Sequence, residues 1–138
     1  MADEANSIAF SIKITGDSTG EIWTGDFRAK KRLSHRDNLK KDAVRRELLG
    51  AQPGTPTDRA LSTAMILSEL SVRLLKAPKW WTEKGEGMDL EDDNIIGTVF
   101  DEAMKVEREA QEALKKKAAD AQAELRKEAA KEATEETK

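Results

Sequence analysis

Residues 8–14 place an apolar side chain at every second position and a small or polar one between. This two-residue period is typical of a strand with one buried face. The expected face consists of Ile8, Phe10, Ile12 and Ile14. Residues 15–20 are turn formers, and residues 21–27 can pair back as a second strand, in which Gly25 marks a bulge or a close backbone contact. The pattern predicts an N-terminal β-hairpin, whose apolar face needs a cover because two strands alone are marginally stable.

Beyond the hairpin, the spacing between apolar residues becomes that of an α-helix. Ser34 and Asp37 have the spacing of a capping box, which predicts a helix from Ser34 to about Leu49. Gly50 is well placed to end it. One face of this helix is basic, and the other is an apolar stripe formed by Leu39, Ala43, Val44 and Leu48.

A second helix is predicted over residues 56–76. Thr55 followed by Pro56 is a start signal, and Pro78 ends the helix because the residue before a proline avoids helical geometry. Apolar residues cover so much of its circumference that we expect it to form the centre of the core. They are Ala60, Leu61, Ala64, Met65, Leu67, Leu70, Leu74 and Leu75.

A third helix is expected to begin near residues 92–93, where acidic side chains suit the positive end of a helix dipole. Its apolar stripe reaches Val106 and can close the core. Residues 107–136 are almost all alanine, glutamate, lysine, arginine and glutamine, which are strong helix formers. Only Leu114 and Leu125 are large and apolar there. This extension is expected to be either a solvated single helix or a weak alanine-seamed coil that needs a partner.

The predicted fold class is therefore α+β and mostly α, with an N-terminal β-hairpin, a small three-helix core and a long C-terminal helix. We expect a tail over residues 1–7, a compact domain over residues 8–106 and a charged helical extension over residues 107–138. The start of the chain lacks a basic region followed by an apolar run, and no stretch approaches about 18 apolar residues. Neither secretion nor membrane spanning is expected.

Charge is unevenly distributed, although the formal net charge is only −3. Residues 83–93 hold six acidic side chains against one lysine, whereas residues 28–46 hold nine basic side chains against two aspartates. The basic residues are Arg28, Lys30, Lys31, Arg32, Arg36, Lys40, Lys41, Arg45 and Arg46. We expect a solvated face that balances the acidic segment within or between molecules, or a contact between subunits. Nucleic-acid binding is the weaker alternative, because the chain is acidic overall and no aromatic residues interleave the basic ones.

No set of residues in the chain predicts a reaction. There is no cysteine, which excludes disulfides, thiolate metal sites and cysteine nucleophiles. The single histidine, His35, belongs to a helix start and is not expected to be a general base. The glycines lack the motif of a phosphate loop, and residues 89–93 lack the spacing of a calcium loop, so we expect those acids to cap a helix. Enzymatic activity, a cofactor and a metal site are all unexpected.

Trp80 and Trp81 stand together after Pro78, in a chain with three tryptophans and no tyrosine. A tandem pair on a short loop cannot place both rings in one small core without cost, so one ring is expected to pack inward and the other to face a partner. The alternative is that both rings cap the helical core. The residues expected to form the contact surface are Trp23, Phe27, Trp80, Trp81 and Leu90.

Several segments follow one another in a recognisable order. Residues 27–34 (Phe-Arg-Ala-Lys-Lys-Arg-Leu-Ser) lead into the basic helix and an Ala/Leu-rich helix, followed by residues 77–81 (Ala-Pro-Lys-Trp-Trp) and 87–96 (Gly-Met-Asp-Leu-Glu-Asp-Asp-Asn-Ile-Ile). Over residues 8–105 this order resembles the tail assembly chaperones of long-tailed bacteriophages. Proteins of that family are small and mostly helical, and several also occur in a frameshifted longer form. The resemblance implies a non-enzymatic chaperone that binds tape-measure and tail-tube proteins in the host cytoplasm during virion morphogenesis.

The extension after Val106 is not part of the family pattern and supports a second interpretation. The protein would then be a phage structural subunit, associated with the capsid or the tail and retained in the virion, whose hairpin adds to a neighbour's sheet. A third and weaker interpretation is a nucleic-acid-associated protein that works through residues 28–46. Whether the chain forms a homo-oligomer is left open.

Overall fold

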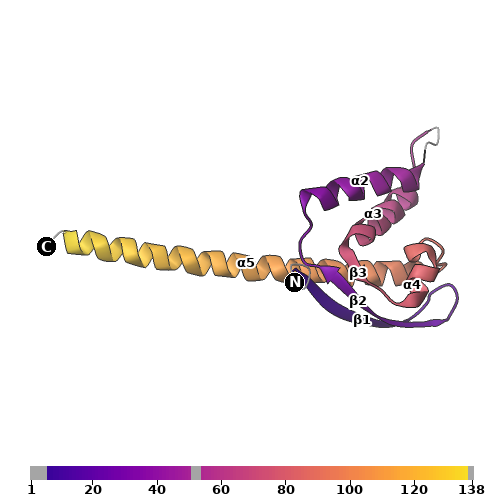
Figure 1. Cartoon of the computed structure of the whole chain (residues 1–138), viewed down its shortest axis with the longest axis horizontal. Helices are drawn as coiled ribbons and strands as arrows, with labels where there is room; N and C mark the ends of the chain where they lie inside the picture. The colour runs from indigo at the N-terminus through magenta and orange to yellow at the C-terminus, as the bar shows by residue number, and fades with distance from the viewer. Residues whose placement is uncertain (1–5, 51–53, 137–138) are drawn as a thin grey trace. The chain divides into compact units, whose positions relative to one another are not determined.

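The structure is a computed structural model that describes residues 6–50 and 54–136. The chain divides into two compact units, Met1–Glu107 and Arg108–Lys138. The elements in chain order are β1 (Ser7–Thr15), β2 (Ile22–Lys30), α2 (His35–Leu49), α3 (Asp58–Arg73), β3 (Leu74–Lys76), α4 (Lys79–Glu83), the 3-10 helix η1 (Gly85–Gly87) and α5 (Asp93–Glu136) (Figure 1). This mostly helical α+β fold with an N-terminal hairpin confirms the predicted class. Of the predicted tail, only Asn6 and Ser7 lie among the described residues, and Ser7 already belongs to β1.

The predicted hairpin is present. β1 and β2 are antiparallel, with Ser7 opposite Lys30 at one end and Thr15 opposite Ile22 at the other. Phe10 lies opposite Phe27, and their rings stack with centroids 5.3 Å apart. Ile12, Phe27 and Ala29 are buried, so the alternating face predicted for the first strand does point into the core, although Ile8 at its end is 40% exposed.

A short third strand, β3, was not predicted. It pairs antiparallel with β2, with Arg28 opposite Lys76 and Ala29 opposite Leu74. The sequence predicted helix to residue 76, and this is wrong for the last three residues. Leu74 has extended backbone angles (φ −74°, ψ 122°), because the free edge of β2 offers these residues hydrogen bonds that replace those of another helical turn.

Helices α2 and α3 lie side by side (Figure 1). Ser34 and Asp37 form the predicted capping box at the start of α2. The predicted apolar stripe of α2 is confirmed in part: Leu48 is half-buried and packs against the core, whereas Leu39 is 73% exposed and no residue of the helix is fully buried. The start of α3 also differs by two residues, since the Thr57 side chain accepts a hydrogen bond from the Ala60 amide and caps the helix.

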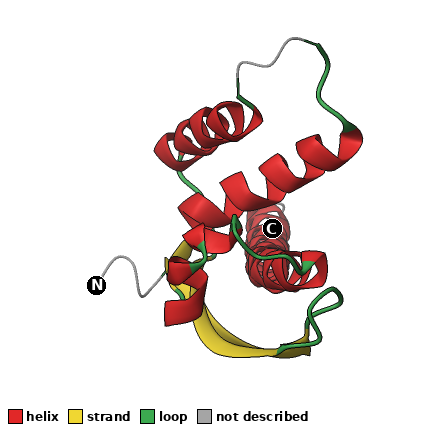
Figure 2. Ribbon diagram, turned by 90° about the vertical axis from the view of Figure 1, so that its right-hand side faces the viewer, coloured by secondary structure: helices red, strands yellow, loops and turns green. Residues whose placement is uncertain are grey.

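The core lies where the hairpin, α3, α4 and the first turns of α5 meet. In Figure 2 the hairpin curves along one side of these first turns and α3 lies on the other side. Of α3, the side chains of Leu67 and Leu70 are buried, whereas Leu61 and Met65 face outward. The buried stripe of α5 is the predicted one and consists of Ile95, Ile96, Val99, Ala103 and Val106. Nearly all apolar burial by α5 therefore occurs within the first unit.

The described residues of the second unit are the remaining part of α5, up to Glu136. Every side chain described from Gln111 to Thr134 is exposed, as the shortage of large apolar residues predicts. Among the described residues, no helix is long and apolar enough to cross a membrane.

Two glycines of the first unit are expected to respond in opposite ways to alanine. A Cβ on Gly25 would lie 2.5 Å from Cγ of Pro78, so Gly25→Ala should destabilise the protein by about 1–3 kcal/mol through overpacking. A Cβ on Gly97, inside α5, would meet open space, so Gly97→Ala should stabilise by about 0.5–1 kcal/mol. Urea unfolding of both variants measures the difference. Equal stabilities would show that the close contact with Pro78 imposes no constraint.

Candidate functional site

The tryptophan pair belongs to an aromatic cluster rather than to an exposed loop. Trp80 and Trp81 lie on the short helix α4 and cross each other at 75°, with ring centroids 6.1 Å apart. Trp23 lies 4.8 Å from Trp80, and Phe27 makes edge contacts with both tryptophans of the pair. Edge-to-face packing of this kind is favourable for aromatic rings. The cluster fastens α4 to the inner face of β2.

Hydrogen bonds and a close approach also fix Trp80. Its indole N–H donates to the Thr24 carbonyl oxygen at 2.8 Å. Gly25 makes room for Pro78 and for the indole nitrogen of Trp80, which confirms the predicted close backbone contact at this glycine. A side chain here would hold α4 away from the strand.

Burial corrects the predicted contact surface. Phe27 is 1% exposed and Trp81 is 3% exposed, so neither can contact a partner in this conformation. Trp23, Trp80 and Leu90 are half-buried and all three pack against the core. Both tryptophans of the pair thus help to cover the core, as the alternative interpretation predicted, and only part of Trp80 is accessible.

Asp92 is the most highly coordinated acid of the site. It is 1% exposed, and its carboxylate accepts hydrogen bonds from the amides of Ser18 and Thr19, at 2.7 and 2.8 Å. The Thr19 hydroxyl and the Trp23 indole donate to its second oxygen, at 2.7 and 3.1 Å. Successive backbone amides form a nest that suits an anion, and here the anion is a side chain of the same chain.

The neighbourhood of Asp92 reinforces this contact. Gly16 approaches the carboxylate so closely that no Cβ would fit between them. Asn94 accepts a hydrogen bond from the Asp17 amide at 3.0 Å and donates one to the Thr15 carbonyl oxygen at 2.8 Å. The sequence predicted that these acids only cap a helix. Instead Asp92 clamps the hairpin turn onto the start of α5.

The same contacts determine how Asp92 titrates. Burial on its own raises the pKa of the carboxyl group, but the hydrogen bonds from Thr19, Ser18 and Trp23 outweigh it and hold the pKa below its ordinary value. Asp92 is therefore ionised at neutral pH. All of these donors stabilise the ionised form of the Asp92 carboxyl group.

A buried ionic network joins α2, α3, β2 and the part of α5 at Glu107, the last residue of the first unit. Arg73 is 1% exposed; it contacts Glu69 at 2.9 Å and Glu107 at 3.2 Å, and it donates to the Lys30 carbonyl oxygen at 2.9 Å. Lys41 reaches the other oxygen of Glu69 at 2.9 Å. Burial raises the pKa of Glu69, but hydrogen bonds from Lys41 and Arg73 reverse the effect and lower it. Sequence reasoning missed this network, whose only local signal is the four-residue spacing of Glu69 and Arg73.

The basic segment does not form a single face. Arg28 and Lys30 lie on β2, Lys31 and Arg32 follow it, and the other five residues lie on α2. Among the described residues, the ion pairs of this segment join it to Asp37, Asp42 and Glu69. Asp93 of the acidic segment pairs instead with Arg59 at 3.0 Å. Among the described residues no ion pair joins the two segments, and their expected balance within or between molecules stays a prediction.

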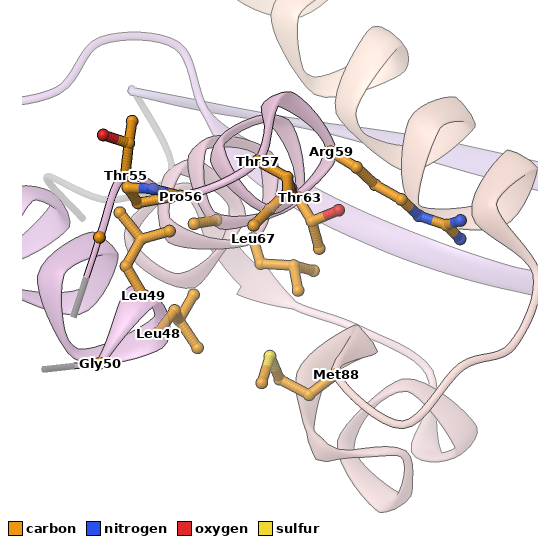
Figure 3. A pocket seen from close by; sticks show the side chains of 13 residues that line it. Leu48, Leu49, Gly50, Thr55, Pro56, Thr57, Arg59, Thr63, Leu67 and Met88 are labelled. Atoms are coloured by element: carbon orange, nitrogen blue, oxygen red, sulfur yellow. The ribbon is translucent and has the colours of Figure 1, made fainter. Parts of the chain in front are cut away.

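An open groove of the first unit lies between α2, α3 and the loop after η1. We call it the Met88 groove; its volume is about 560 Å³ (Figure 3). Its residues are Leu48, Leu49, Gly50, Gly54, Thr55, Pro56, Thr57, Arg59, Ala60, Thr63, Ala64, Leu67 and Met88. Leu67 is buried at its base, whereas Met88 on the opposite wall is 53% exposed. The lining combines leucines, alanines, a proline and a methionine with three threonines and one arginine, which suits an apolar side chain of another molecule beside a few polar contacts.

The position of Met88 depends on the aromatic cluster. Gly87, with φ +95°, packs so tightly that a Cβ would lie 2.8 Å from the Trp81 ring and 3.0 Å from Leu67. The Met88 amide donates to the Gly85 carbonyl oxygen at 3.2 Å. The tryptophan that the sequence marked as a partner anchor thus supports the segment carrying the exposed methionine. No sequence signal distinguished Met88.

The described residues contain no group of three or more histidine, cysteine, aspartate or glutamate side chains that could hold a metal ion. His35 is the first residue of α2 and is exposed. Comparisons of the chain with protein families, curated proteins and solved structures found no match.

Asp92→Asn is expected to destabilise the protein near neutral pH, because one acceptor oxygen is replaced by an amide group that faces N–H donors. The folded state depresses the pKa of Asp92, so its stabilising contribution is present above the pKa of the unfolded chain and is lost as the pH falls through the folded pKa. Wild type should therefore lose stability more steeply than Asp92→Asn as the pH falls below about 5. Urea unfolding across this range measures both slopes. Asp89→Asn, an exposed neighbour, is the charge-matched control, and equal slopes for wild type and Asp92→Asn would contradict the expectation.

Proposed function

We propose that the protein is a non-enzymatic tail assembly chaperone of a long-tailed bacteriophage, which binds tape-measure and tail-tube proteins during virion morphogenesis in the host cytoplasm. The observation that carries the proposal is the Met88 groove, an open apolar site bounded by side chains of two helices and a loop. Met88 belongs to residues 87–96, one of the segments on which the family resemblance rests. The resemblance indicates the class of client protein, and the groove is the proposed binding site for that client.

The chemistry of the groove suits temporary binding. An assembly chaperone must cover apolar surface on its client and then release it. Methionine adapts to differently shaped apolar side chains, because it is unbranched and polarisable. The groove is open to solvent and modest in size, so it buries a few client side chains rather than a large interface. Such a contact dissociates when the client gains a better partner in its own assembly.

The contact surface in this proposal differs from the one based on aromatic residues. The double substitution Trp80→Ala with Trp81→Ala does not test binding, because removing a buried tryptophan leaves a cavity that costs about 3–5 kcal/mol. Loss of capture by that variant would follow from unfolding alone. An exposed groove residue separates binding from stability.

Met88→Glu is expected to reduce capture of the client at least tenfold while helicity and unfolding midpoint stay close to wild type, because Met88 is 53% exposed. The measurement is co-purification of the tape-measure and tail-tube proteins of the same phage genome after co-expression with each variant. Leu39→Glu, at a 73% exposed leucine outside the groove, is the control and should capture the client normally. Normal capture by Met88→Glu would overturn the groove assignment.

A phage structural subunit is the alternative function, and the exposed part of α5 over residues 111–134 favours it, because such a helix can lie along a particle. The chaperone proposal predicts that purified mature particles lack the protein and that lysates of infected cells contain it bound to tail proteins. Mass spectrometry of both samples decides between the two. Detection in particles at structural copy number would replace the chaperone with a virion component.

A further inference from the structure

The helix of the second unit carries an unpartnered apolar face. Leu114 and Leu125 are 46% and 61% exposed. Alanines extend the face at spacings of four and three residues, so that it repeats every 11 residues. The face consists of Ala110, Leu114, Ala118, Ala121, Leu125 and Ala129. Eleven residues make three turns of a nearly straight helix, so these six side chains form one continuous stripe.

The stripe reads the same in both directions. Its successive spacings are four, four, three, four and four residues, which are symmetric about the peptide bond between Ala119 and Asp120. If a second copy of this helix lies antiparallel with its centre at that point, Leu114 of each copy meets Leu125 of the other. The alanines pair in the same way, Ala110 with Ala129 and Ala118 with Ala121. A surface that complements itself under a twofold rotation is what a symmetric dimer requires.

The charges next to the stripe favour the antiparallel direction. Lys115 and Lys117 flank the stripe, and a parallel pair in register would place the same lysines of both copies at the same height. The antiparallel pair places them at the height of residues 122–124 of the other copy, which include Glu124. Opposite charges at these positions stabilise a helix pair and like charges destabilise it.

Glu124 lies in a mostly acidic surrounding within its own helix. The residues four positions away on either side are Asp120 and Glu128, which carry the same charge, and the opposite charge among its neighbours is Lys127, three positions along. Like charges at a spacing of four destabilise a single helix. A flanking lysine of a second copy adds a further opposite charge to Glu124.

We propose that the second unit pairs with the same unit of another copy of this chain, as an antiparallel two-helix coil whose twofold axis passes between Ala119 and Asp120. Alanines at the seam let the two backbones approach closely, and the two leucines of each helix supply most of the buried apolar area. The seam is small, so the dimer is reversible rather than permanent. This inference is independent of the proposed chaperone activity, because it uses only the second unit.

Sedimentation velocity of the full chain over a range of concentrations tests the pairing. Wild type should pass from monomer to dimer, and Leu114→Glu with Leu125→Glu should weaken the association at least tenfold. Ala123→Glu with Ala130→Glu adds the same charge on the outer face of the helix and should leave association unchanged. Circular dichroism checks that all variants retain their helix. A monomer at every concentration, or a dimer that both pairs of substitutions affect equally, would overturn the proposal.

Disulfide trapping tests the direction, and the absence of native cysteine makes single-cysteine variants unambiguous. Ala110→Cys and Ala129→Cys lie 19 residues apart, about 28 Å along a helix. The antiparallel pair predicts a disulfide only when the two full-length variants, one of them carrying a mass tag, are mixed. A disulfide formed by either variant alone would show a parallel pair and overturn the register.

Discussion

The hairpin turn and the start of α5 are joined through one ionised carboxylate. Asp92 accepts hydrogen bonds from two backbone amides, a hydroxyl group and an indole N–H. All four donors belong to the turn between β1 and β2 or to the beginning of β2. This contact fixes the hairpin against α5, which in turn places the aromatic side chains of β2 where α4 can pack on them. The position of Met88 follows from that packing through Trp81 and Gly87. The groove thus depends on a polar contact at the far end of the hairpin.

Ionic contacts also supplement a weak apolar contact between α2 and the core. α2 has no buried residue, yet it packs along α3, and Lys41 of α2 reaches Glu69 in the buried network around Arg73. Removing these charges from water costs free energy. The ion pairs offset that cost only because each charged group has partners of opposite charge in good geometry. Such a network fixes the position of α2 along α3 more strictly than an apolar contact would.

Local signals in the sequence predicted most of the fold. The alternation of residues 8–14, the capping box at Ser34 and the stripe ending at Val106 each depend on neighbours within one or two turns, and the structure confirms them. Features that depend on distant residues could not be predicted. β3 forms because β2 has a free edge, and Asp92 looks like any other helix-start acid until its donors from the hairpin turn are known.

The candidate site was harder to predict for the same reason. Composition and local order singled out Trp81 and Phe27, because large aromatic side chains are common at interfaces. The same property makes them good core residues, and only the tertiary packing shows which role they take. Met88 carries no local signal, since a methionine between a glycine and an aspartate is unremarkable in sequence. Its exposed place on the wall of the groove in the folded chain distinguishes it.

The contact between Asp92 and the hairpin turn also orders events during synthesis. The amide of Ser18 and its acceptor are separated by 74 positions in the chain, so closing this contact is a long-range step with a large loop entropy. A nascent chain that ends before Asp92 cannot anchor its hairpin, even though both strands left the ribosome early. The free edge of β2 stays without β3 until residues 74–76 have emerged. The N-terminal strands are therefore made first and secured late, and in that interval their unpaired edges are open to pairing with other chains.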